Sequence, residues 1–249
     1  MSFLSPFSHT CYDYRMAAKN HKPPRRIIHT SDLHILSLNG YASDGFKAVI
    51  DLAIKSEAEL LIIAGDLFDQ NRIEDEVVEF VCKQIKRLPI PVALLPGNHD
   101  CLVPESVYNR KGFWQECTNL HIFRDGRGEA LDLPAQHLFL WGKPHDSYIN
   151  DVRPMEGVPQ PENNGTWNIL VAHGYVVQSV PRIPSSYLIK ESEIQGTNWD
   201  YIALGHIPLF RVVCNQPMAC YSGAPSDDSS ALVVDLDEEN GVQVNRPPL

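Results

Sequence analysis

The stretch AELLIIAGDLFD, residues 58–69, decides the fold. Residues 60–64 are all apolar, which indicates a strand buried on both faces, because a half-exposed strand would alternate apolar and polar positions. Gly65 and Asp66 follow at once and are typical of a turn. The next segment, residues 74–88, has a helical pattern with acidic residues first and basic residues last, as the helix dipole favours. The stretch therefore predicts a strand, a loop and a helix.

The same pattern occurs on both sides of this stretch. RRIIHTSDLH, residues 25–34, is an apolar run that ends in polar residues, and a helical pattern follows it at residues 44–57. PIPVALLPGNHD, residues 89–100, is a third strand with a glycine-containing turn at its end. Apolar strands that alternate with amphipathic helices indicate βαβ units and a buried, partly parallel sheet.

The second half of the chain reads as strands with few helices between them, such as WNILVAHG at residues 167–174 and DYIALGHIP at residues 200–208. This change predicts a second sheet packed on the first. We therefore predict an α/β fold class, a four-layer α/β/β/α sandwich of two mixed β-sheets flanked by helices. The stretch at residues 152–166, rich in Pro and Asn, is expected to be a loop over one end of the sheet.

The chain of 249 residues is long enough for one large core. We predict that residues 25–249 form a single domain and that residues 1–24 are a disordered or loosely ordered leader. No apolar run is long enough to span a membrane, and the start lacks the pattern of a signal peptide. The six cysteines form no CxxC pair. We expect a cytoplasmic protein with reduced thiols and no membrane partner.

The charge balance bears on the partner. Lys and Arg number 21 against 31 for Asp and Glu, which gives a net charge of −10. A field of this sign repels phosphate backbones unless a local basic patch overrides it. Long nucleic acid is therefore a disfavoured partner.

Five apolar strands run directly into polar residues that can bind a hard metal ion. These residues are Asp32, His34, Asp66, Asn98, His99, His173 and His206. Ligands of open α/β sheets gather outside the carboxyl ends of the strands, so these side chains are expected to converge. Carboxylate, imidazole and amide ligands without thiolate suit Mn²⁺, Fe, Zn²⁺, Ni²⁺ or Mg²⁺. Two such ions that share a carboxylate and a hydroxide are typical of phosphoryl-transfer sites.

Each feature taken alone has a structural explanation. An Asp-x-His sequence usually marks a turn, and Gly-Asp after a strand is more often a capped turn than a ligand. A single histidine at a strand end, such as His173 or His206, is more often a surface or core residue than a ligand. All of them together, in this order and each at a strand end, favour the metal site.

The ordered motifs resemble those of the calcineurin-like metallophosphoesterase superfamily. They are Asp32-Leu33-His34, Gly65-Asp66-Leu67-Phe68-Asp69, Gly97-Asn98-His99-Asp100, His173-Gly174 and Gly205-His206. The spelling GDLFD, with LGHI and the later YSGAP, is most similar to the SbcD-type exonuclease branch. The resemblance covers about residues 25–240.

The resemblance implies two divalent metal ions, Mn²⁺ first among the candidates. One ion would be held by Asp32, His34 and Asp66, and the other by Asp66, Asn98, His173 and His206. Asp66 would bridge them.

The resemblance also implies two catalytic residues beside the metals. His99 would protonate the leaving-group oxygen or stabilise charge on the phosphate, and Asp69 would orient it. Pairing of a carboxylate with histidine favours the protonated imidazole that a general acid requires. Asp100 is expected to cap a turn.

One position departs from the family pattern. The last motif of the family reads Gly-His-x-His, and its second histidine completes the first metal site, but here that position is Pro208. The protein is then a dinuclear enzyme with a more open first metal, an enzyme active only at high metal concentration, or a non-catalytic relative. The retained residues favour a functioning enzyme. His145 is an alternative ligand, although we expect it to lie on a surface loop.

The predicted function is a metal-dependent phosphodiesterase that hydrolyses small phosphodiesters by attack of a metal-bound hydroxide. An SbcD-type DNA exonuclease is the main alternative. The charge balance opposes it, as does a chain that ends soon after its last strands, without the extra capping region expected of such nucleases. A non-catalytic relative with a degraded first metal site is the third possibility. The sequence predicts no oligomeric state.

Overall fold

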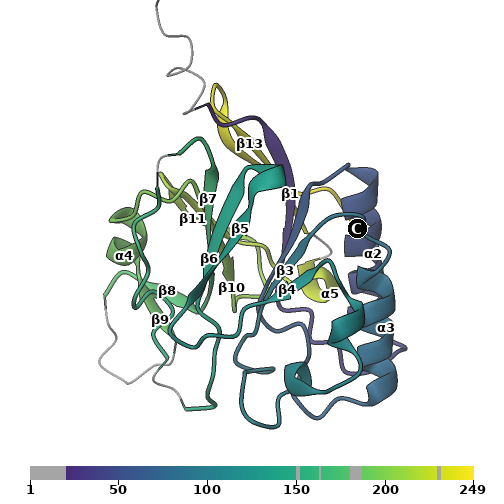
Figure 1. Cartoon of the computed structure of the whole chain (residues 1–249). Helices are drawn as coiled ribbons and strands as arrows, with labels where there is room; N and C mark the ends of the chain where they lie inside the picture. Colours follow the sequence, from purple (N-terminus) through teal and green to yellow (C-terminus); the bar gives the residue numbers. More distant parts are fainter. Residues whose placement is uncertain (1–20, 150–151, 163, 180–186, 229–230) are drawn as a thin grey trace, which may run out of the picture.

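The computed structural model describes residues 21–149, 152–162, 164–179, 187–228 and 231–249. Within them, two six-stranded β-sheets pack face to face (Figure 1). The first sheet has the order β14-β13-β1-β2-β3-β4, and the second has the order β11-β12-β10-β7-β6-β5. Both contain parallel and antiparallel pairs, so the predicted sandwich of two mixed sheets is confirmed.

The strands of the first sheet are β1 (Arg25–Thr30), β2 (Leu60–Ala64), β3 (Val92–Leu95), β4 (Leu120–Ile122), β13 (Leu232–Asp237) and β14 (Gly241–Asn245). Those of the second are β5 (Glu129–Leu133), β6 (Leu138–Gly142), β7 (Trp167–His173), β10 (Tyr201–Gly205), β11 (Arg211–Asn215) and β12 (Met218–Tyr221). Strands β8 (Tyr175–Val177) and β9 (Leu188–Lys190) form a small separate sheet. The short helices are α5 (Pro225–Asp228), η1 (Val107–Asn109), η2 (Trp114–Glu116) and η3 (Pro134–Gln136).

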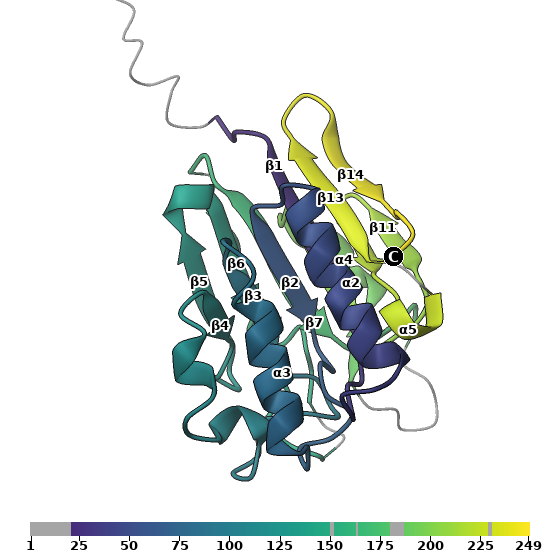
Figure 2. The same ribbon diagram turned by 90° about the vertical axis from the view of Figure 1, so that its right-hand side faces the viewer.

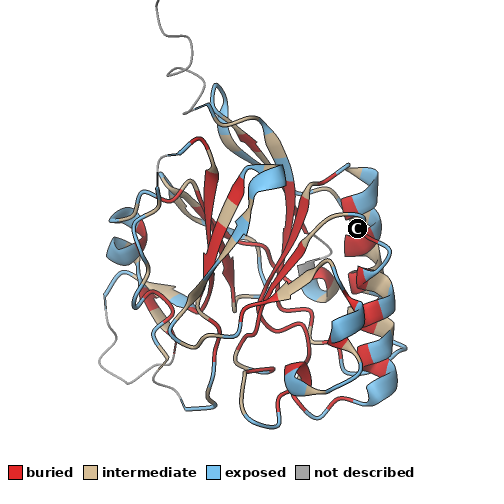
Figure 3. Cartoon of the chain, in the orientation of Figure 1, coloured by how far each residue is buried: buried red, intermediate tan, exposed pale blue. Residues whose placement is uncertain are grey.

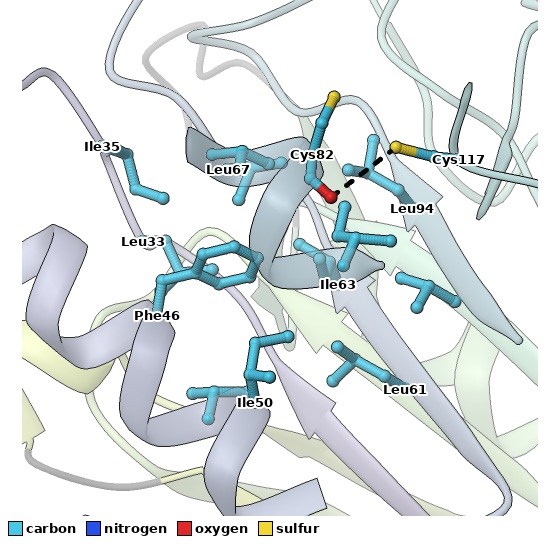
Figure 4. Packing of buried hydrophobic residues seen from close by; sticks show 14 of the residues in the cluster. Leu33, Ile35, Phe46, Ile50, Leu61, Ile63, Leu67, Cys82, Leu94 and Cys117 are labelled. Atoms are coloured by element: carbon cyan, nitrogen blue, oxygen red, sulfur yellow. Dashed lines mark hydrogen bonds between the residues drawn. The ribbon is translucent and has the colours of Figure 1, made fainter. Parts of the chain in front are cut away.

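Two long helices, α2 (Tyr41–Lys55) and α3 (Asp75–Ile85), cover the outer face of the first sheet (Figure 2). Helix α2 begins slightly before the predicted residue 44. It buries Phe46 and Ile50, which lie one helical turn apart, and Figure 4 shows them in the same cluster as Leu61 of β2. The apolar stripe of the helix therefore fixes it on the sheet.

The outer face of the second sheet carries a thinner layer. Its helix α4 (Glu191–Gln195) is short, and β8 and β9 lie beside it (Figure 1). Trp199 and Ile194 are buried in the cluster on this face. The described residues of the predicted loop at 152–166 form neither helix nor strand, as expected.

The core between the sheets is apolar and comes from both of them. Every residue of β2 and β10 is buried, which matches the apolar runs seen in the sequence (Figure 3). Strands β1, β2 and β3 are parallel neighbours, and so are β7 and β10. Their carboxyl ends therefore meet at one edge of the sandwich, the lower edge in Figure 1.

The predicted leader lies mostly outside the described residues, which begin at His21. Its last part is held against the body of the protein. Lys22 Nζ lies 2.7 Å from Asp200 Oδ2, and the carbonyl of Pro23 accepts a hydrogen bond of 2.7 Å from Trp167 Nε1. No helix in the described part of the chain is long and apolar enough to cross a membrane.

Candidate metal centre

The structure brings the predicted ligands together at the carboxyl edge of the sandwich. Asp32 and His34 follow β1, Asp66 follows β2, and Asn98 and His99 follow β3. His173 ends β7, and His206 comes directly after β10. Two groups of ligand atoms form there, each with all its atoms within 4.8 Å of one another, and Asp66 belongs to both.

The second group consists of Asp66, His173 and His206, with Asn98 beside them. His173 Nδ1 donates a hydrogen bond of 2.8 Å to the carbonyl of Ala64, which leaves Nε2 to face the centre. This Nε2 lies 3.1 Å from Asp66 Oδ2 and 3.0 Å from Asn98 Oδ1. Asn98 Oδ1 also lies 3.0 Å from His206 Nδ1. Four nitrogen and oxygen atoms that can bind a cation therefore converge.

This convergence tests whether the residues fit a metal ion. At such distances a proton or a cation must lie between these atoms, because facing lone pairs repel one another. An octahedral ion with bonds near 2.1 Å separates adjacent ligand atoms by about 3.0 Å. The donor set of carboxylate, imidazole and amide oxygen is the one that Mn²⁺ and similar ions prefer. The four predicted ligands of the second site therefore fit a divalent cation.

The first group consists of His34, Asp66 and His99. His34 Nε2 lies 3.9 Å from Asp66 Oδ2, and the ring centroids of His34 and His99 are 4.5 Å apart. His34 Nδ1 is buried and makes no hydrogen bond within the described residues, and the Asp69 carboxylate lies 3.4 Å from it. The group therefore offers a second place for a cation next to the shared carboxylate.

Asp32 is predicted to be a ligand of the first site, and that role stays a prediction. It is close to the centre but belongs to neither group of ligand atoms in the described residues. Both of its carboxylate oxygens accept a hydrogen bond from the backbone N–H of His206, at 3.1 and 3.0 Å. Ser31 Oγ donates to it as well. In this arrangement Asp32 fixes the loop that carries a ligand of the second group.

Backbone strain is concentrated at the centre. Asp32, His34 and Asp66 have φ angles of 53°, 51° and 52°, and His206 has a φ of 100°. These four are among only seven non-glycine residues with positive φ in the described part of the chain. Such conformations cost about 1–3 kcal/mol each and persist where the surroundings impose them, most often at functional sites.

Glycine is required at two of the strand ends. A Cβ atom on Gly205 would lie 1.8 Å from the carbonyl oxygen of Ala64, so only glycine lets β10 approach β2 there. A Cβ atom on Gly65 would lie 2.0 Å from His173 Nδ1. The glycines of the Gly65-Asp66 and Gly205-His206 pairs thus leave room for the side chain of His173 between the two sheets.

Buried charges at the centre shift one another's pKa. Burial would raise the pKa of Asp66, but the charge of His173 and a hydrogen bond from it lower that pKa below its usual range. Burial raises the pKa of Asp32. Burial also lowers the pKa of His206 to about 4, and the nearby charge of His173 adds to this shift. His206 is therefore neutral at pH 7 and keeps its lone pair for a metal ion.

His99 is held by the backbone of Asp69 more closely than by its side chain. His99 Nδ1 donates a hydrogen bond of 2.9 Å to the carbonyl of Asp69, whereas the Asp69 carboxylate lies 3.9 Å away. That carboxylate is nearer to His34 Nδ1, at 3.4 Å. The backbone N–H of His99 also donates to Asp66 Oδ1 at 2.9 Å. The ring is thus oriented by a fixed carbonyl.

Asp100 has the structural role that the sequence suggested. It is fully buried and accepts hydrogen bonds from the backbone N–H groups of Gly97, at 2.8 Å, and Phe68, at 3.0 Å. Tyr108 donates its hydroxyl to the same carboxylate. Asp100 therefore holds the turn that carries Asn98 and His99.

His145 is not a surface residue, and this expectation was wrong. Its side chain is fully buried, and Nε2 donates a hydrogen bond of 2.8 Å to the carbonyl of His173. Nδ1 has no hydrogen-bond partner within the described residues. The reason is topological, because His145 follows β6, which is parallel to β7 and ends at the same edge. His145, in the segment WGKPHD at residues 141–146, therefore follows the same rule as the predicted ligands, which all lie at the carboxyl ends of strands.

Pro208 lies in the exposed loop after β10, and its carbonyl accepts a hydrogen bond of 2.9 Å from Ala224.

An open pocket of about 520 Å³ adjoins the centre on its solvent side. It is lined by Asp69, Gln70, Asn71, Arg72, Asn98, His99 and Tyr148. Arg72 and Tyr148 were not predicted, because neither stands at a strand end.

Known proteins are similar to this chain in sequence and in fold. The family model described as calcineurin-like phosphoesterase matches residues 25–210. The DNA double-strand break repair protein Mre11 of Saccharolobus solfataricus is 26% identical over 199 residues, which are 73% of this chain and 49% of Mre11. One component of the nuclease SbcCD of Staphylococcus epidermidis is 32% identical over 88 residues, 30% of this chain and 23% of that protein.

Solved structures give the same picture of the fold. A dimetal phosphatase from Danio rerio superposes with a TM-score of 0.56 at 11% identity, over 86% of this chain and 93% of the phosphatase. The chain spans about half the length of the Mre11 relative. The match over most of the chain, with the ligand motifs gathered at one edge, shows that the chain belongs to the calcineurin-like phosphoesterase family of metal-dependent hydrolases acting on phosphoester bonds.

Proposed function

We propose that the protein is a dinuclear metal-dependent phosphodiesterase that hydrolyses small phosphodiesters. The observation that carries the proposal is Asp66, whose carboxylate belongs to both groups of ligand atoms. A shared carboxylate is what holds two cations at the spacing used for phosphoryl transfer. Asp66, Asn98, His173 and His206 would hold one ion, and Asp32, His34 and Asp66 would hold the other.

When bound, the two ions would supply a deprotonated water and a positive clamp on the phosphate oxygens. The donor set without thiolate makes Mn²⁺ our first candidate. A cytoplasmic location and a single domain over residues 25–249 remain predictions.

His99 is proposed as the general acid. Its Nδ1 is engaged by the carbonyl of Asp69, so Nε2 is the nitrogen left to give a proton to the leaving alcohol. Its ring is partly exposed and lines the open pocket, where an alcohol would leave. His173, by contrast, is fully buried and cannot reach such a group.

A direct experiment is the hydrolysis of bis(p-nitrophenyl) phosphate by protein loaded with Mn²⁺. We expect turnover that EDTA abolishes and added Mn²⁺ restores. Turnover that chelation leaves unchanged would contradict the metal mechanism. Absence of turnover, with one metal ion or none per chain, would support the non-catalytic relative that Pro208 suggests.

A DNA exonuclease is the second candidate, and it is favoured by the similarity to Mre11 and to the SbcCD nuclease. The net charge of −10 opposes it, because long DNA is bound mainly through phosphate neutralisation. The test is incubation of linear DNA with Mn²⁺-loaded protein at low salt. Digestion that falls steeply with salt would establish the exonuclease, and intact DNA would exclude it.

A further inference from the structure

We propose that the open pocket beside His99 binds the leaving group, with Tyr148 as an aromatic wall and Arg72 as an anion contact. The pocket would favour a phosphodiester whose leaving alcohol is a flat aromatic group that carries a second negative charge. This inference rests on the proposed phosphodiesterase function, because it takes His99 as the residue that meets the leaving oxygen.

The pocket adjoins the metal-ligand groups. His99 belongs to one of the groups and Asn98 lies beside the other, whereas Arg72 and Tyr148 line the pocket and belong to neither group. A general acid must lie within hydrogen-bond reach of the oxygen that it protonates. The leaving alcohol is therefore on the His99 side of the phosphorus atom, and its substituent extends into this pocket.

Tyr148 is anchored by its hydroxyl while its ring stays open. Asn71 Nδ2 donates a hydrogen bond of 2.8 Å to the Tyr148 hydroxyl. Asn71 is itself buried and fixed, because Nδ2 also donates to the carbonyl of Cys101 at 2.9 Å and Oδ1 accepts from the N–H of Val107 at 2.9 Å. The side chain of Tyr148 is nevertheless 57% exposed. A preorganised, exposed ring on a pocket wall suits contact with another flat ring.

Arg72 supplies the charge of the pocket. Its side chain is exposed, and within the described residues no hydrogen bond or ion pair engages its guanidinium. Arg110 differs, because it donates to the carbonyls of Ile73 and Asn71 and pairs with Asp75 at 2.9 Å. A planar guanidinium without an internal partner is a good contact for a carboxylate or phosphate.

Asp69 is the acidic member of the pocket. Its carboxylate faces the histidines, 3.4 Å from His34 Nδ1. In the loaded protein the metal ions would engage the phosphate. A second negative group, on the leaving alcohol, would be repelled by Asp69 and attracted to Arg72, which orients that group toward Arg72.

The test measures dissociation constants of Mn²⁺-loaded protein by calorimetry, so it does not depend on turnover. The probes are methylphosphonate, benzylphosphonate and 4-carboxybenzylphosphonate, none of which can be hydrolysed at the C–P bond. We expect the benzyl group to strengthen binding by about fivefold, and the added carboxylate to strengthen it by about fivefold more.

Two variants assign these gains. Tyr148→Leu should remove most of the preference for benzyl over methyl, and Arg72→Gln should remove only the preference for the carboxylate. Tyr41→Leu is the matched control, because Tyr41 is an exposed aromatic residue outside the pocket. It should change neither preference.

Equal binding of methyl and benzyl probes by the unmodified protein would overturn the proposal, as would preferences that survive both variants or no binding of any probe. Hydrolysis of bis(p-nitrophenyl) phosphate tests the phosphodiesterase separately. An enzyme that hydrolyses this substrate but does not prefer the benzyl and carboxybenzyl probes would therefore contradict the proposed role of the pocket, and it would still support the phosphodiesterase function.

Discussion

The two groups of ligand atoms share Asp66 but differ in how the fold holds them. In the second group, His173 is fully buried, is fixed by the carbonyl of Ala64 and is contacted from behind by His145. In the first group, the side chains of His34 and His99 are 32% and 44% exposed. The second group is built into the contact between the sheets, whereas the first is more exposed and its His99 lines the open pocket. The buried group is suited to permanent metal binding and the open group to exchange of water and substrate.

The resemblance to the family relates Pro208 to this difference. The family histidine that it replaces would complete the first site, on the open side, where water or substrate can fill the place of a missing ligand. A proline at an equivalent point of the buried group would leave a gap that water reaches with difficulty. We therefore propose that water or substrate takes the place of this ligand at the first site.

The largest expected effect comes from Asp66→Asn, because it removes the ligand that both groups share. Loss of a residue that only supports a metal ligand costs about 10- to 100-fold in affinity or activity, so loss of the shared ligand should cost more than about 100-fold. Elemental analysis should show loss of both metals, together with loss of turnover. Asp132→Asn, an exposed carboxylate on β5, is the control. Retention of two metals by Asp66→Asn would show that the groups do not depend on this carboxylate.

His99→Ala tests the chemistry of the open group. Removal of a general acid should lower turnover by about 100- to 10,000-fold, and the metal content should stay unchanged. The structure makes this a sharp test, because the His99 ring also lies within the first group of ligand atoms. A fall in metal content equal to the fall in turnover would identify His99 as a ligand instead.

Pro208→His should affect the open group alone. The restored imidazole should raise the affinity of the first site, which we expect to bind its metal more weakly, by about tenfold. Substitutions of residues around a metal site typically change metal affinity by about this much. The tighter metal should be unaffected in the same calorimetric titration. An unchanged titration would mean that position 208 does not face the centre.

The smallest effect on activity is expected away from both groups, at His29 in the core between the sheets. Its imidazole is fully buried and bonds Tyr201 at 2.8 Å, and burial lowers its pKa from 6.5 to about 3. The unfolded chain takes up a proton below about pH 6.5 and the folded chain does not, so stability falls as the pH drops from there toward 3.

Between pH 7 and pH 5, His29 should lower the free energy of unfolding of the metal-free protein by about 2 kcal/mol. Denaturant titrations in EDTA measure this, and His29→Gln should show a weaker pH dependence. An equal pH dependence in the variant would rule out His29 as its source.

The sequence was informative wherever a strand fixed the position of a residue. The carboxyl ends of parallel strands converge at one edge of a sheet regardless of how the loops run. The positions of Asp66, Asn98, His173 and His206 could therefore be predicted from the apolar strand that precedes each of them in the sequence. The helix at residues 75–85 was predicted from periodicity and charge for the same local reason.

Features that depend on contacts between distant loops could not be predicted. Tyr148 reaches the pocket only because Asn71, far away in the chain, anchors its hydroxyl. The role of the Asp69 carbonyl depends on the backbone path after β2, which the resemblance to a family does not specify. His145 was misjudged because its loop was read as surface, although its strand ends beside β7.

The most direct test of the account is a crystal structure of the Mn²⁺-loaded protein with anomalous diffraction from the metal. We predict two anomalous peaks on either side of the Asp66 carboxylate, one beside His173 and His206 and the other beside His34. A single peak, or two peaks that do not share Asp66, would contradict it.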